Sequence, residues 1–150
     1  MPRRIDSKSE SDSYNKKAHW FERGNLAQQC VSVQKLVRWA LSTLGDCASK
    51  LNTLVEKGAE FKTNAASLKS VISSELERLD QAWARDIQAL SILSRLLEPS
   101  YERDRDDKLT DAQIADMRVA IERFAQLASD LNRLAVAYQK QVSELRGKSP

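Results

Sequence analysis

The sequence predicts an all-α protein, an elongated three-helix bundle with coiled-coil-like heptad packing. Two observations predict this class. Only 4 glycines and 3 prolines occur among 150 residues, and the prolines stand at positions 2, 99 and 150, so two long stretches lack the strongest helix breaker. Within those stretches apolar residues recur at alternating steps of three and four, the spacing of one helix face.

The first 24 residues are rich in serine, lysine and acidic residues and poor in apolar ones. Such a segment buries too little apolar surface to order itself, so residues 1–24 are expected to form a largely disordered polar tail. The spacing from Tyr14 to Phe21 is compatible with a short helix over residues 13–22. The segment also lacks the apolar stretch of a secretory signal, which predicts an intracellular protein, in the cytoplasm, with the nucleus left open.

A helix is expected over residues 25–57. Asn25 and Gln28 fit a capping box at its start, and Gly58 fits the left-handed residue that follows a helix end. Between these signals runs a nine-residue apolar seam, which consists of Leu26, Cys30, Val33, Val37, Ala40, Leu44, Cys47, Leu51 and Leu54. Further apolar residues lie off this seam, so the helix is expected to touch more than one neighbour.

A second helix is expected over residues 64–98, capped by Thr63 or Asn64 and ended by Pro99. A turn at Gly58 would make the first two helices a hairpin. The alternative is one uninterrupted helix, roughly 110 Å long, because the apolar stepping continues in phase through Gly58. Eleven-residue recurrences favour a straight or slightly right-handed path for the second helix; they relate Ala65, Leu76 and Ile87, and likewise Leu68, Leu79 and Leu90.

After a charged connector over residues 99–109, expected to be mobile, Thr110 and Gln113 fit a capping box for a third helix over residues 111–146. Its heptad positions are all apolar: Ile114, Met117, Ile121, Phe124, Ala128, Leu131, Ala135, Tyr138, Val142 and Leu145. Ala120, Leu127 and Leu134 widen this stripe to the width typical of a bundle helix.

The three helices would each span roughly 50 Å and fold into a single domain over residues 25–146. A four-helix bundle is the alternative, with the fourth helix supplied by residues 13–22 or by a partner.

No catalytic, cofactor-binding or metal site is indicated. His19 is the only histidine, the glycines stand alone, and metal-ligand spacings such as Cys-x-x-Cys are absent. The connector acids Asp104, Asp106 and Asp107 lack the glycine and closing glutamate of a calcium loop. Cys30 and Cys47 lie about 25 Å apart on one helix and are interpreted as small core residues. We therefore expect a protein that is not an enzyme and holds no cofactor.

The surplus of apolar helix surface predicts a non-catalytic interaction protein, an adaptor or a subunit of a larger assembly. Its partner would be another protein or a second copy, bound through amphipathic helix faces. The candidate protein-binding residues are Trp20, Phe21, Val31, Leu36, Trp39, Leu41, Leu127 and Leu134. Of the long-helix tryptophans, Trp83 is expected in the core, whereas Trp39 is interpreted first as core and alternatively as a partner contact.

Two other functions are weaker alternatives. One is a nucleic-acid-binding bundle with a basic N-terminal arm, but acidic residues dilute the basic ones there and the net charge is only +3. The other is binding to a membrane surface, which needs a cationic helix face that these mixed-charge helices do not show. No run of apolar residues is long enough to predict a transmembrane segment.

Overall fold

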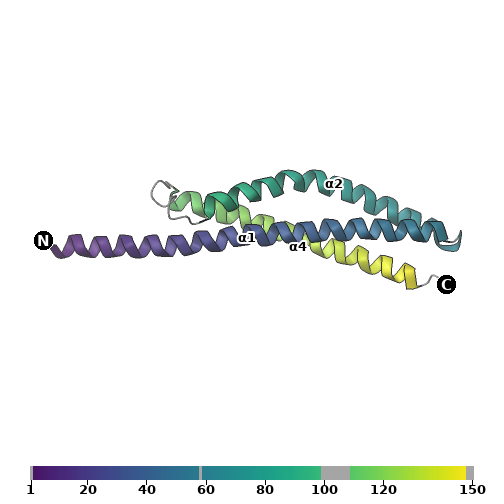
Figure 1. Ribbon diagram of the computed structural model, residues 1–150, viewed down its shortest axis with the longest axis horizontal. Helices are drawn as coiled ribbons and strands as arrows, with labels where there is room; N and C mark the ends of the chain where they lie inside the picture. The colour runs from purple at the N-terminus through teal and green to yellow at the C-terminus, as the bar shows by residue number, and fades with distance from the viewer. Residues whose placement is uncertain (1, 58, 99–108, 148–150) are drawn as a thin grey trace.

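Three long helices account for most of the chain. The computed structural model describes the backbone of residues 2–57, 59–98 and 109–147, and the side chains of residues 20–57, 63–98 and 109–147. The helices are α1 (Pro2–Lys57), α2 (Ala59–Leu97) and α4 (Asp111–Gly147). They pack together lengthwise into an elongated molecule (Figure 1), and the described residues contain no strand. The predicted all-α three-helix bundle is therefore confirmed.

The first two helices form a hairpin. α1 ends at Lys57, α2 begins at Ala59, and the two helices pack against one another along their length (Figure 1). The alternative of one uninterrupted helix through Gly58 is therefore wrong, although residue 58 itself lies outside the described residues. Because α2 begins so soon after the turn, Thr63 and Asn64 lie within the helix and do not cap it.

The structure differs from the sequence expectation at the N-terminus. α1 is helical from Pro2, where a largely disordered tail and at most a short helix over residues 13–22 were expected. Asn25 consequently lies inside α1 and does not cap it. Between Leu26 and Pro2 the helix passes one glycine, Gly24, and no proline, so a helix anchored by packing from Leu26 onward meets only this weak breaker in that direction.

The core of α1 follows the predicted seam. All nine seam residues from Leu26 to Leu54 are buried, including both cysteines, which are free thiols. Leu36, Leu41 and Val55 lie off the seam and pack partly buried against the same cluster. α1 therefore buries a wider face than one seam because it has two neighbours, α2 and α4.

The eleven-residue recurrences describe only part of the buried face of α2, because Ala65, Leu79 and Leu90 are buried whereas Leu68, Leu76 and Ile87 are only partly buried. The buried positions step by seven, with a single step of four between Leu79 and Trp83; the buried residues are Ala65, Ile72, Leu79, Trp83, Leu90 and Leu97. An inserted step of four locally unwinds a heptad and keeps the buried face turned toward its neighbour. Trp83 is in the core, as expected. The helix ends at Leu97, shortly before Pro99.

The start of α4 is the capping box read from the sequence. The backbone N–H of Gln113 donates to Thr110 Oγ1 over 3.1 Å, and the backbone N–H of Thr110 donates to Gln113 Oε1 over 2.9 Å. This reciprocal pair satisfies two backbone donors at the helix start. Along α4 the first heptad row is fully buried: Ile114, Ile121, Ala128, Ala135 and Val142.

Polar contacts fix how α2 lies on α1. The buried side chain of Gln34 donates from Nε2 to the Ile87 carbonyl over 2.9 Å and to Ser91 Oγ over 2.6 Å. The buried guanidinium of Arg23 donates to the Leu96 carbonyl in the last turn of α2 over 2.8 Å. A cation at a helix C-terminus is favourable because it complements the carbonyl end of the helix dipole.

Candidate protein interface

The three helices are not equally in contact. α1 packs extensively against both α2 and α4, whereas α2 and α4 touch one another at few points. Each outer helix is therefore covered by α1 on one side and remains open on the side that faces the other outer helix. We call this open channel, with α2 and α4 as its walls, the α2/α4 groove.

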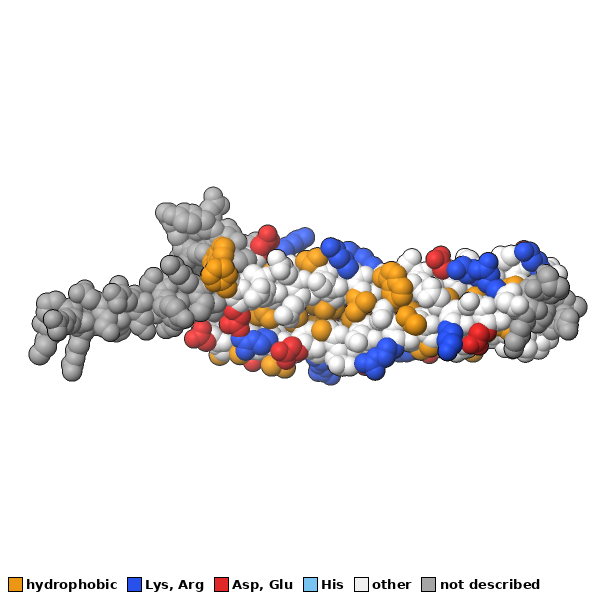
Figure 2. Space-filling view, turned by 90° about the horizontal axis from the view of Figure 1, so that it is seen from below, with side chains coloured by type: hydrophobic (Ala, Val, Ile, Leu, Met, Phe, Trp, Pro, Cys, Tyr) orange, Lys and Arg blue, Asp and Glu red, His pale blue; other side chains and the backbone are white. Residues whose placement is uncertain are grey.

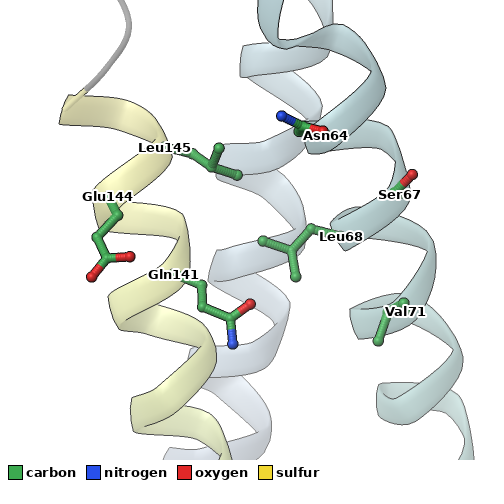
Figure 3. Close-up of a pocket in the computed structure, with 7 residues that line it drawn as sticks. All are labelled: Asn64, Ser67, Leu68, Val71, Gln141, Glu144 and Leu145. Carbon is green, nitrogen blue, oxygen red and sulfur yellow. The ribbon is translucent and has the colours of Figure 1, made fainter.

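One hollow of this groove lies between the start of α2 and the end of α4. It has a volume of about 450 Å³ and is lined by Asn64, Ser67, Leu68, Val71, Gln141, Glu144 and Leu145. In Figure 3, Leu68 and Leu145 point toward one another across the gap, α1 passes behind them, and Glu144 points away. An apolar floor with polar residues at its edges is the usual make-up of a protein contact region.

The α4 wall of the groove is a second heptad stripe. It steps by three and four from Met117 to Tyr138 and then reaches Leu145 in the hollow past the polar Gln141; its apolar residues are Met117, Ala120, Phe124, Leu127, Leu131, Leu134, Tyr138 and Leu145. Only Leu131 is buried among these, and Leu127 is 45% exposed. A helix that needs no further neighbour would present polar residues here, so this wall has the composition of an incompletely covered core.

The α2 wall is more mixed. Before the step of four in the register of α2, seven-residue steps from the hollow's Val71 and Leu68 reach Arg78 and Glu75. After that step the same edge of the helix is formed by Ala82, Ala89 and Leu96, each one residue before a buried position, with Ile92 one turn before Leu96. Val71, Ile92 and Leu96 are each about half exposed. Apolar residues thus stand at both ends of this wall, with an exposed ion pair between Arg78 and Glu75 near its middle, 2.9 Å apart.

The predicted binding residues fall into three groups. Leu127 and Leu134 lie on the α4 wall of the groove, whereas Leu36 and Leu41 pack against the core between the helices. Trp20, Phe21, Val31 and Trp39 are exposed on α1. The core interpretation of Trp39 is wrong, because the neighbouring seam residues Val37 and Ala40 already occupy the buried face and leave this indole 45% exposed.

Trp20 and Phe21 form an aromatic pair near the point where α1 leaves the bundle. Their ring centroids are 5.5 Å apart with an interplanar angle of 85°, an edge-to-face arrangement. Phe21 also borders a hollow of about 400 Å³ between α1 and α4, beside the ion pair of Arg118 with Glu22. The side chain of His19 lies outside the described residues.

The groove residues of α2 were not found from the sequence. Val71, Ile92 and Leu96 do share one helix face, and this spacing is the sequence pattern from which they could have been identified as a contact surface. Arg78 and Arg85 interrupt that face in its middle, so the pattern reads as a solvated surface until the position of α4 is known.

Figure 2 shows one face of the molecule, on which apolar side chains reach the surface in patches along the middle of the bundle, with Lys and Arg toward the edges. Scattered exposed apolar residues are ordinary, but a continuous row indicates a contact surface. The α4 wall of the α2/α4 groove supplies such a row, and the α2 wall adds apolar residues at its two ends.

The two cysteines, Cys30 and Cys47, are free thiols and both are buried. Burial raises the pKa of the Cys30 thiol from 9.0 to about 11 and also raises the pKa of the Cys47 thiol. Both are therefore protonated at neutral pH, which is typical of structural cysteines and not of reactive ones.

Within the described ranges, no three His, Cys, Asp or Glu side chains lie close enough together to hold a metal ion. The connector acids Asp104, Asp106 and Asp107 fall outside those ranges. Among the helices as described, none carries a stretch long and apolar enough to cross a membrane.

No protein-family model, no curated protein and no solved structure matches this chain. The function must therefore be argued from the groove itself.

Proposed function

We propose that this protein is a non-catalytic interaction subunit that binds another polypeptide helix in the α2/α4 groove. The observation that carries the proposal is the half-covered second heptad stripe of α4, from Met117 to Leu145, whose Leu145 end lies across an open hollow from Leu68 and Val71 of α2. Heptad stripes are positions that a packed neighbour normally covers.

The shape of the groove favours a helix as its ligand. Two helices that lie side by side leave between them a channel in which a third helix fits, and such a ligand is held through residues at i, i+3, i+4 and i+7. The α4 wall offers this periodicity along most of its length, and the α2 wall offers apolar residues at its two ends. Leu68 and Leu145 converge at one end, where an apolar side chain of the ligand would fill the hollow (Figure 3).

The energetic gain is moderate for each residue. Complete burial of a Val, Leu or Ile side chain contributes about 1.5–3 kcal/mol, so covering half of one contributes roughly 1 kcal/mol. Val71, Ile92, Leu96 and Leu127 are each about half exposed. The four together would contribute several kcal/mol, enough to support binding when the ligand adds complementary contacts of its own.

A matched pair of photo-crosslinking variants tests this proposal. Leu127 and Val136 lie on the same helix and are 45% and 46% exposed. Val136 follows the buried Ala135 by one residue, whereas Leu134 of the groove wall precedes it by one, so Val136 lies on the opposite edge of α4, away from the groove. A photoreactive residue at position 127 should form defined protein adducts in the native host, and one at position 136 should not. Equal labelling at the two positions, or none at either, would contradict the proposal.

A further inference from the structure

We infer that the α2/α4 groove is occupied by a second copy of this chain, with α2 of each copy packed against α4 of the other. This inference rests on the proposed function and names its partner. The two copies would be related by a two-fold axis parallel to the helices, and the four groove helices would together form a four-helix bundle.

The length of the groove argues for a long helical partner. The walls run from Leu68 to Leu96 on α2 and from Met117 to Leu145 on α4, and each is about 42 Å long. A short peptide would leave most of this apolar surface uncovered. A second copy supplies two helices as long as these walls, because a two-fold axis places the groove of one copy against the same groove of the other.

The area of the groove also fits a stable dimer. Two adjacent helices, each about 10 Å wide and about 42 Å long, present roughly 800 Å² on one copy. This is about the surface that each partner buries in a specific protein complex of standard size. The groove therefore needs no further surface of the molecule to account for a dimer.

The charges of the two walls select one of two possible arrangements. The outer rim of the α2 wall carries Arg78 and Arg85, and seven-residue steps along the outer rim of the α4 wall reach Asp116, Arg123, Asp130, Ala137 and Glu144. The α2 rim is thus basic and the α4 rim is net acidic. An axis parallel to the helices brings these unlike rims together, whereas a perpendicular axis would place Arg78 and Arg85 against their own copies.

The rim charges remain available for such contacts. Arg78 pairs with Glu75, and Asp130 lies 3.7 Å from Arg133, but both are local pairs within one helix. The side chains of Arg78 and Asp130 stay 65% and 55% exposed in these pairs. Exposed pairs of this kind are weak, so they would not prevent contacts with a second copy.

The mass of the 150-residue protein, measured by light scattering on a size-exclusion column, is the first test. The expected value is twice the 17.0 kDa mass of one chain. Leu127→Glu should weaken dimerisation by about 100-fold or more, because a two-fold interface carries each substitution twice. Val136→Glu is the matched control and should leave the dimer intact. Circular dichroism should show that both variants keep their helices.

Disulfide trapping between singly substituted chains tests the arrangement. Val71 and Gln141 line the same hollow and so lie at the same level of the bundle. Mixed Val71→Cys and Gln141→Cys chains should therefore form a disulfide between copies in a glutathione buffer, since a disulfide requires Cα atoms within about 7 Å. The native Cys30 and Cys47 are buried with raised pKa values and should not compete.

The outcomes separate this inference from the proposed function. A monomer at all concentrations tested, or a dimer that Leu127→Glu leaves intact, would overturn the inference. If Val71→Cys chains formed a disulfide with Ile92→Cys chains and not with Gln141→Cys chains, α2 would be packed antiparallel against α2 of the other copy. That result would also overturn the inference. If the protein is monomeric and Leu127 still crosslinks to a different protein, the proposed function stands while the second copy is excluded.

Discussion

The contact of Gln34 with Ser91 gives a quantitative test of how α1 and α2 are held in register. Gln34 is 8% exposed, and its amide donates to Ser91 Oγ over 2.6 Å and to the Ile87 carbonyl over 2.9 Å. We propose a double-mutant cycle of Gln34→Leu and Ser91→Ala. Leucine keeps most of the volume of glutamine, so the cycle reports on the hydrogen bond with little contribution from a cavity.

The expected coupling follows from the geometry. Ser91→Ala leaves Gln34 its bond to the Ile87 carbonyl, and Gln34→Leu lets the Ser91 hydroxyl turn to a carbonyl of its own helix. The hydrogen bond between the two side chains is therefore the one interaction that both single variants remove, and the coupling energy reports its contribution. A net contribution of about 0.5–1.5 kcal/mol is typical of one such bond, so the coupling energy should be about 1 kcal/mol.

Urea unfolding of the four proteins, followed by circular dichroism, measures this coupling. The comparison is valid when all four share one slope of free energy against urea concentration. A coupling energy within about 0.3 kcal/mol of zero, which is the usual scatter of additive sites, would refute the reasoning. It would mean that the hydrogen bond between Gln34 and Ser91 contributes nothing measurable to the register of α2 on α1.

Three further predictions concern the stability of single helices. Thr110→Ala should lower the free energy of unfolding by about 0.5–2 kcal/mol in a urea titration, because it removes the oxygen that caps α4. Gly45→Ala should raise it by about 0.5–1 kcal/mol, since Gly45 lies within α1 and an added Cβ would meet nothing within 4 Å; an unchanged or lower value would contradict this. Burial raises the pKa of Cys30 from 9.0 to about 11, so its contribution to stability is complete below pH 9 and declines as the pH rises to about 11. Cys30→Ala should lose less stability over that interval, and equal losses in both proteins would exclude Cys30 as the cause.

The buried faces of α1 and α4 could be predicted because local and long-range signals agree there. Every seam residue from Leu26 to Leu54 is apolar at heptad spacing, and each one is buried. Thr110 and Gln113 form their capping box from residues three apart, a contact that depends on nothing distant. The hairpin of α1 and α2 was predicted from the glycine that follows Lys57, and the end of α1 at Lys57 and the start of α2 at Ala59 agree with it.

The start of α1 could not be predicted because the residues that mark a helix start there contribute little free energy. A capping residue such as Asn25 contributes about 1 kcal/mol, and continuation of the helix past it replaces the cap with ordinary backbone hydrogen bonds. Gly24 adds a cost of the same order. The sequence before these residues contains no breaker until Pro2, so local signals alone did not decide where the helix begins.

The groove could be predicted only in part, because it is a property of two helices. Leu127 and Leu134 were identified from the width of the α4 stripe alone. Val71 shares a hollow with Leu145 of that stripe, and this placement could not be predicted because Arg78 and Arg85 divide the face of Val71 in the sequence. Which apolar positions remain uncovered depends on how α2 and α4 sit on α1, and no local pattern encodes that.

The central position of α1 has a consequence for how the molecule opens. Detachment of α4 breaks its packing with α1 but very little packing with α2, so the α1–α2 hairpin can persist as a cooperative unit of its own. Loss of α1 would remove the neighbour of both other helices at once. Native-state hydrogen exchange should therefore show the amides of α4 exchanging through a lower-energy opening than those around Gln34 and Ile87. Filling the groove should raise the protection of α4 toward that of the hairpin, so that protection of α4 reports occupancy of the groove without any label on the ligand.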